Sequence, residues 1–249
     1  FTIELLRSMQ ERGDLAKNDQ GQWIEEEALD WERLPARVEA VIAERIGRLD
    51  RDLLALLQAA AVEGELFTAE IAARMLGREE REIVSLLSNE LERKHRLVRA
   101  QTIVRRGGLL LSTFRFRHSL FQHYLYHNLS EIERVRLHEQ AGTILEKVYS
   151  DREDTASIAP QLARHFMEAQ VTGKAIKYLY EAATHAVTLC AYEDGVEQLK
   201  KGMALLQSLP PGDERDRQEL ELRLASALAL QGVDGTHASS VRAAWARAR

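Results

Sequence analysis

The fold of this chain is decided by residues 97–116, which read LVRAQTIVRRGGLLLSTFRF. Two short runs rich in Val, Ile, Leu and Phe, 97–104 and 109–116, are separated by the pair Gly107-Gly108. Two strand-like runs joined by glycines, which tolerate the positive φ angles of a tight turn, predict a β-hairpin.

Three short helices are predicted before the hairpin, because apolar residues recur there at three- and four-residue spacing. Asp50 is a suitable N-cap residue for the first helix, and Gly64 and Gly77 are suitable ends for the first and second. The third helix is expected over about 79–94. Three helices followed by a hairpin is the element order of a winged helix, which we expect over residues 48–128.

Beyond residue 128 the pattern predicts helices only. Ser130 and Glu133 have the spacing of a capping box, so a helix is expected to begin at about Glu131. We expect helices over about 131–149, 155–169, 173–191 and 193–209, and a last one from the Pro210-Pro211-Gly212 turn to about 231.

Two of these helices resemble each other at an offset of 20 residues. The matching positions are Ala175, Ile176, Leu179 and Ala182 in one helix and Gly195, Val196, Leu199 and Gly202 in the other. Small residues at such positions let helices pack closely. The pattern predicts antiparallel helix pairs similar to tetratricopeptide repeats over residues 129–249.

The composition agrees with a mainly helical fold. Hydrophobic residues make up 45% of the 249 residues, which argues against disorder, and aromatic residues make up only 6%, which argues against a large all-β fold. The net charge of −5 does not favour a polyanion-binding chain as a whole. No apolar run is long enough to span a membrane, so we expect a cytoplasmic protein that does not contact membranes.

The single cysteine, Cys190, excludes an internal disulfide. It falls in an Ala-rich segment that we expect to be helical, and we interpret it as a packing residue rather than a nucleophile.

No motif for nucleotide hydrolysis is present. The only Gly-Lys pair, Gly173-Lys174, is followed by Ala175 rather than Ser or Thr, and Glu168 stands where the first glycine of a phosphate-binding loop would be. No nucleophile motif supports a catalytic triad either. We therefore expect no catalytic residues and no enzyme activity in this chain.

Two histidine patterns could indicate a metal site but are incomplete. His138-Glu139 begins like a zinc-protease motif, but Gly142 replaces its second histidine. His123 and His127 could share one helix face, yet no clear third ligand accompanies them. We expect no metal.

Basic residues surround the hairpin with no acidic residue between them. A basic wing could contact DNA phosphates, with the third helix in the major groove. Against this, the third helix begins with Glu79, Glu80 and Glu82, which would repel the DNA backbone. The basic residues could instead be solvated or pair with acidic surfaces. They are Arg93, Lys94, Arg96, Arg99, Arg105, Arg106, Arg115 and Arg117.

His118 follows the second strand of the hairpin. Strand alternation places it on the same face as Phe114 and Phe116, opposite Arg115 and Arg117. An inward-facing histidine at a strand-to-helix junction is either a hydrogen-bonded core residue or a ligand contact.

Three segments, residues 34–49, 56–67 and 116–120, resemble a known family: the bacterial signal-transduction ATPases with numerous domains, which are joined to adenylate cyclase or transcription-regulator domains. In that family the order is effector domain, phosphate-loop ATPase, helical lid, winged helix and helical repeats. The resemblance implies that residues 1–47 are the remnant of the helical lid and that the ATPase core lies upstream in cis.

The resemblance also implies a role for His118. The winged helix of this family folds back on bound ADP, and a Met-His-Asp motif in plant and animal relatives places its histidine against the ADP phosphate. Here that motif is replaced by Arg117-His118-Ser119, which lacks the carboxylate.

The implied function is a regulatory fragment. Its winged helix would switch with the nucleotide state, and its repeats would dock a protein or peptide. ADP or ATP would bind to the full-length parent and not to this fragment alone. The alternative function is a DNA-binding module of a transcriptional regulator.

Overall fold

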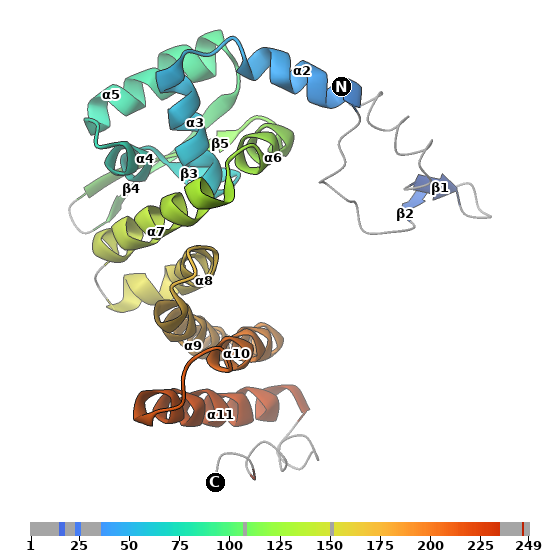
Figure 1. Cartoon of the computed structure of the whole chain (residues 1–249), viewed down its shortest axis with the longest axis vertical. Coiled ribbons are helices and arrows are strands. Elements are labelled where there is room, and N and C mark those ends of the chain that lie inside the picture. Colours follow the sequence, from blue (N-terminus) through green and yellow to red (C-terminus); the bar gives the residue numbers. More distant parts are fainter. Residues whose placement is uncertain are drawn as a thin grey trace. The chain divides into compact units, whose positions relative to one another are not determined.

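The computed structural model of the chain describes residues 15–17, 23–25, 36–106, 109–149, 152–234 and 246. The fold is mainly helical and contains a small three-stranded antiparallel sheet (Figure 1). The chain divides into two compact units. The first unit comprises residues 1–102 and 112–129, and the second unit comprises residues 103–111 and 130–249.

The described part of residues 1–47 begins with two strands. β1 (Leu15–Lys17) pairs antiparallel with β2 (Trp23–Glu25), with Leu15 opposite Glu25. The sequence did not indicate these strands within the helical lid remnant that the resemblance implies for residues 1–47, although the β-branched and aromatic residues of β2 favour extended backbone. α2 (Ala36–Ile46) follows. Residues 1–14, 18–22 and 26–35, and the Gly107-Gly108 turn, lie outside the described residues.

The first two of the three predicted helices begin and end as the capping residues predict. The Asp50 side chain accepts the N–H of Leu53 at 2.8 Å and caps α3 (Arg51–Glu63), which ends at Gly64. α4 (Ala69–Leu76) ends at Gly77, whose φ of 63° is left-handed and costs glycine little.

The third predicted helix has the expected extent but not the expected winding. Its first part is α5 (Glu80–Ser85), and its second part, η1 (Leu86–Lys94), is a π-helix. The N–H of His95 donates to the Glu90 carbonyl, five residues earlier, which is the π-helical pattern. The inward residues Ile83, Leu87 and Leu91 are nevertheless fully buried.

The predicted hairpin is present as β4 (Val98–Arg106) and β5 (Leu109–Phe116). A third strand, β3 (Leu66–Thr68), pairs with β5, so the sheet order is β3-β5-β4. Phe67 lies opposite Phe114 in this pairing, and its ring lies 5.2 Å from that of Phe116. The hairpin prediction is therefore confirmed, while the sequence did not indicate the third strand, because a three-residue strand is too short to show alternation.

α6 (Ser119–His127) completes the first unit and packs on α2 and α3. The core formed by these helices and the sheet contains 21 buried residues. Its largest fully buried side chains include Leu56, Leu57, Phe67, Phe116 and Phe121.

The second unit contains five described helices, and consecutive helices pack against each other. The predicted capping box is present, since Ser130 accepts the N–H of Glu133 while the Glu133 carboxylate accepts the N–H of Ser130. The helices are α7 (Glu131–Val148), α8 (Arg152–Glu168), α9 (Thr172–Thr188), α10 (Tyr192–Leu206) and α11 (Asp213–Asp234).

Small residues lie where these helices approach most closely, as predicted. A Cβ built at Gly195 would lie 3.3 Å from the Ala183 carbonyl oxygen, and one built at Gly202 would lie 3.1 Å from Leu222 and 3.8 Å from Leu179. The start of α10 therefore lies beside the end of α9, and the end of α10 lies nearer the middle of α9. This arrangement makes α9 and α10 antiparallel.

No helix in the described part of the chain is both long enough and apolar enough to cross a membrane.

Candidate functional site

His118 occupies the N-cap position of α6 and its side chain is exposed. The expectation that it faces inward with Phe114 and Phe116 is wrong. Both phenylalanines are buried, but β5 ends at Phe116, so strand alternation no longer determines the direction of residue 118. An exposed histidine at this junction is accessible to a ligand or to another domain.

The His118 ring lies against a cation–aromatic pair. Its centroid is 5.9 Å from that of Phe121, and the guanidinium of Arg45 lies 4.9 Å from the same Phe121 ring. Arg45 also donates from Nη2 to the carbonyl of His95 at 2.8 Å. Arg45 therefore connects α2 to α6 and to the end of η1.

Arg117 holds the backbone beside His118. Its N–H donates to the Leu97 carbonyl at 2.9 Å, and its Nε donates to the Val98 carbonyl at 3.2 Å. In the resembled motif a carboxylate follows the histidine, and Ser119 cannot supply one. In this chain the bonds of Arg117 tie the segment to the start of β4 instead.

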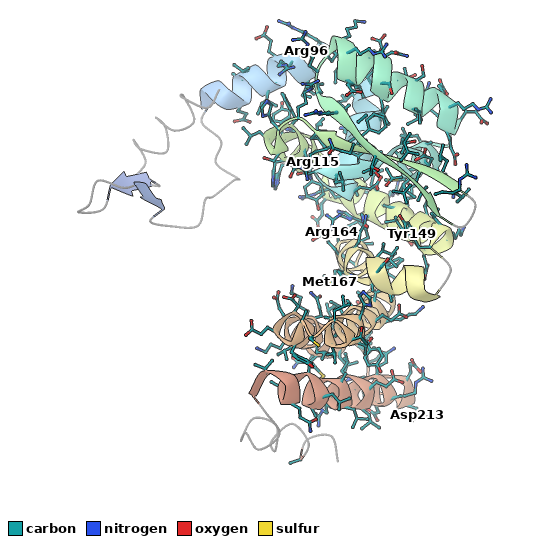
Figure 2. The ribbon with its side chains drawn as sticks, turned by 180° about the vertical axis from the view of Figure 1, so that it is seen from behind. Arg96, Arg115, Tyr149, Arg164, Met167 and Asp213 are labelled. Carbon is teal, nitrogen blue, oxygen red and sulfur yellow. The ribbon has the colours of Figure 1, made fainter. Side chains whose placement is uncertain are left out.

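Arg96 lies at the same end of the hairpin, where η1 gives way to β4 (Figure 2). Its backbone is left-handed, with a φ of 54°, and its side chain is exposed. This conformation costs a non-glycine residue about 1–2 kcal/mol. Gln170 and Cys190 share it, so it follows from the way these helices end and is not by itself a functional signal.

These four residues, Arg45, Arg96, Arg117 and His118, are called the basic cluster below. No carboxylate among the described residues forms an ion pair with its three arginines. The carboxylates of neighbouring elements have other partners: Glu44 pairs with Arg48, Glu90 with Lys94, and Glu92 accepts the N–H of Ala100. The arginines of the cluster are therefore not neutralised by a carboxylate of the described residues.

The other basic residues of the hairpin region differ in their surroundings. Arg115 lies 3.8 Å from Glu65, and Arg93 bonds the amide oxygen of Asn89. Arg99 is exposed without a partner among the described residues. The Arg106 side chain lies outside the described part.

The acidic residues at the start of the third helix are partly neutralised. Glu80 pairs with Arg74 at 3.1 Å, and Glu82 and Asp52 both pair with Arg78. Hydrogen bonding to Glu82, with smaller contributions from Asp52, outweighs desolvation and raises the pKa of Arg78 above its usual value. The sequence did not indicate the pair of Asp52 and Arg78, because these residues lie 26 positions apart.

His138, considered above for zinc binding, pairs with another histidine. Its Nδ1 lies 2.9 Å from Nδ1 of His165 on α8, and both side chains are fully buried. Burial, with the nearby charges of Arg164 and Arg134, lowers the pKa of His138 to about 3, and burial lowers that of His165 well below its usual value. Both rings are therefore neutral at neutral pH. In the described residues no group of three potential ligands could hold a metal ion.

His123 and His127 do share a face of α6, with their rings stacked at 6.2 Å. Partial burial and the neighbouring His127 lower the pKa of His123.

A groove of about 380 Å³ lies between α9 and α11. Lys174, Lys177 and Tyr180 line one wall, and Arg217 and Glu221 lie on the other. Lys174 is held at 2.6 Å from Glu146 of α7. Although partial burial opposes ionisation, hydrogen bonds from Lys174 and Tyr178 hold the pKa of Glu146 below its usual range.

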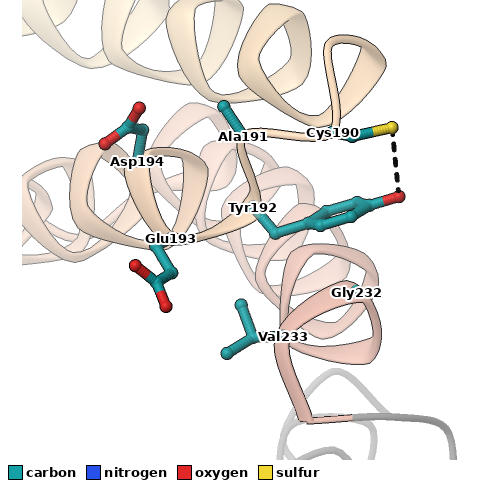
Figure 3. Close-up of a pocket in the computed structure, with 7 residues that line it drawn as sticks. All are labelled: Cys190, Ala191, Tyr192, Glu193, Asp194, Gly232 and Val233. Atoms are coloured by element: carbon teal, nitrogen blue, oxygen red, sulfur yellow. Dashed lines mark hydrogen bonds between the residues drawn. The ribbon is translucent and has the colours of Figure 1, made fainter.

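Cys190 lines a second pocket of about 350 Å³ (Figure 3). The expectation that it packs on a helix is wrong: it is exposed in the turn after α9, with a φ of 60°. The Tyr192 hydroxyl donates to its Sγ at 3.7 Å, and the Tyr192 ring occupies the space beside Gly232.

Comparisons with protein-family models, with curated proteins and with solved structures give no match to this chain. Its function is therefore argued from the geometry described above.

Proposed function

We propose that this chain is a regulatory, non-catalytic part of a multidomain signal-transduction ATPase. In this proposal the first unit is a winged-helix arm that contacts the nucleotide bound by an ATPase core in cis. The second unit is a tetratricopeptide-like array that docks a protein or peptide. The order of three helices, hairpin and helical pairs supports this assignment, together with the resemblance of residues 34–49, 56–67 and 116–120.

The observation that carries the proposal is the exposed His118 within the basic cluster. His118 follows Arg117 and packs on the Phe121 ring that Arg45 also contacts, and such a site suits a phosphate group because guanidinium groups form strong charge-assisted hydrogen bonds to phosphate oxygens. A contact made only when the arm is closed over ADP would favour the closed arrangement. ATP, or a partner bound to the helices, would favour an open arrangement by binding that arrangement more tightly than the closed one.

The groove between α9 and α11 supports the docking role of the second unit. Its volume of about 380 Å³ is within the range of small ligand pockets, and its wall combines cationic, anionic and aromatic side chains. Such a surface suits a peptide that carries both polar and apolar side chains.

Replacing His118 with alanine in the full-length parent tests the nucleotide contact. We expect ADP affinity to fall about tenfold, as for the loss of one charge-assisted hydrogen bond. His127→Ala is the matched control, since His127 is also exposed and lies on the same helix. Unchanged ADP affinity and unchanged activation in His118→Ala would exclude the sensor role.

A second candidate function is DNA binding by the first unit. It is favoured by Arg93 and Arg99, which are exposed and have no carboxylate partner in the described part of the chain. The acidic start of the third helix opposes it. We expect the chain not to bind duplex DNA even at low salt. Binding that weakens steeply as salt increases would instead support this second candidate.

A further inference from the structure

We propose that the open edge of β4 is a docking site for an extended, acidic segment of a partner protein, which adds to the small sheet as a further strand beside β4. This goes beyond the proposed function, in which docking takes place on the helices, and it does not rest on that function. Because the site lies on a single strand, it does not depend on the placement of the two units.

β4 is an edge strand of the sheet. The sheet order is β3-β5-β4, so β5 is paired on both sides and β4 on one side only. The Phe116 N–H donates to the carbonyl of Glu65, just before β3, and the Arg117 N–H donates to the carbonyl of Leu97, just before β4. The other side of β4 carries the row of backbone N–H and C=O groups that an edge strand leaves unused. Another strand can pair with this row.

Most of β4 is exposed. Every residue from Arg99 to Arg105 is exposed, with Ile103 at 65% and Val104 at 39%. β4 is nine residues long and contains no proline, and its β-branched residues favour extended backbone. Natural edge strands are commonly short or covered by another element, whereas this one is long and accessible.

A carboxylate of the chain itself already binds the edge of β4. The side chain of Glu92, in η1, accepts the N–H of Ala100 at 3.1 Å. The Ala100 N–H is therefore directed away from β5, although Ala100 lies within the strand. An added strand would replace this bond with one to its own backbone carbonyl. The bond shows that a donor of the edge is available to an acceptor outside the sheet.

The charges of β4 select an acidic partner. The strand contains Arg99, Arg105 and Arg106 and no acidic residue. Neither Arg99 nor Arg105 has an ion-pair or side-chain hydrogen-bond partner among the described residues. A carboxylate opposite an arginine on the adjacent strand stabilises strand pairing, whereas a second arginine there destabilises it. A second copy of this chain, paired through its own β4, would bring only arginines and is disfavoured.

The backbone of the edge selects a polypeptide rather than DNA. An extended polypeptide offers both donors and acceptors to the N–H and C=O groups of β4, as in other cases of β-strand addition. A DNA backbone offers acceptors but no donors for the carbonyl groups of β4. The occupant is therefore an extended peptide segment whose acidic side chains lie opposite the arginines.

The test is fluorescence anisotropy of the whole chain with a labelled peptide, Glu-Thr-Val-Thr-Val-Thr-Glu, blocked at both ends. We expect this peptide to bind. The matched peptide with lysine in place of both glutamates should bind about tenfold more weakly.

Two further peptides keep both glutamates and carry N-methyl groups on alternate residues, one set in each frame. One of them should lose binding, because methylation in that frame removes the donors that face β4, and the other should bind like the unmethylated peptide. This comparison uses the unchanged chain and therefore needs no variant that folds.

Charge reversal of β4 gives a second comparison. Arg99→Glu combined with Arg105→Glu should weaken binding of the glutamate peptide about tenfold and strengthen binding of the lysine peptide. Both residues are exposed, so the thermal unfolding temperature should not change. Arg81→Glu combined with Lys200→Glu is the matched control, because it changes the net charge equally at exposed positions of α5 and α10.

Four results would overturn the inference. The first is no binding of the glutamate peptide. The second is equal binding of the two N-methylated peptides, which would mean that the backbone of the edge is not used. The third is unchanged binding by the charge-reversed β4, or tighter binding of duplex DNA that this variant abolishes. The fourth is a dimer of the chain alone that the peptide dissociates, because a second copy would then be the occupant.

Discussion

Replacing Gly142 with valine is expected to destabilise the second unit by about 3 kcal/mol, near the upper end of the usual cost of overpacking. A Cβ at this position would lie 3.1 Å from Cζ of Phe166 and 3.3 Å from Cβ of His165. Phe166 is itself buried and stacks on Tyr178, so its ring has little room to move. α7 and α8 would have to separate. Urea denaturation followed by circular dichroism measures the change.

Gly173→Ala is the control for this prediction. Nothing lies within 4 Å of a Cβ at Gly173, which is also in a helix of the second unit. The change should be neutral or stabilise the chain by up to about 1 kcal/mol, because alanine favours helix more than glycine does. If Gly142→Val were as stable as the unchanged chain, α7 and α8 would not cross this closely.

Acidification is expected to destabilise the second unit through His138 and His165. Both are neutral when folded because burial lowers their pKa values, that of His138 to about 3. An unfolded histidine titrates near 6.5, so below that pH the unfolded chain binds more protons than the folded chain. Stability is then lost as pH falls from about 6.5 towards 3, by roughly 1.4 kcal/mol per pH unit for His138, and the lowered pKa of His165 adds to this loss.

The double variant His138→Leu, His165→Leu isolates this effect. It replaces both hydrogen-bond partners by apolar groups, so neither is left unpaired in the core. Its free energy of unfolding should depend less steeply on pH between 6.5 and 4 than that of the unchanged chain. His185→Gln, which removes a histidine of α9 outside this buried pair, is the matched control. Equal slopes for the double variant and the unchanged chain would contradict the assignment.

Local sequence signals determined most of the elements of this fold. Asp50 and Ser130 mark helix starts because their side chains accept N–H groups only three residues ahead, so the bonds depend on nearby sequence alone. Gly77 marks a helix end because its own backbone must be left-handed. The hairpin followed from two adjacent runs rich in Val, Ile, Leu and Phe that are separated by Gly107-Gly108. The sequence also indicated where helices pack closely, through Gly195 and Gly202.

Only the tertiary structure decided which residues meet at the sites. His118 is exposed because β5 ends two residues before it, and the basic cluster forms because α2, η1 and α6 converge on one end of the hairpin. The partner of His138 lies 27 residues away on another helix. Periodicity describes one element at a time, whereas each of these contacts depends on how separate elements pack together, so no local pattern in the sequence contains them.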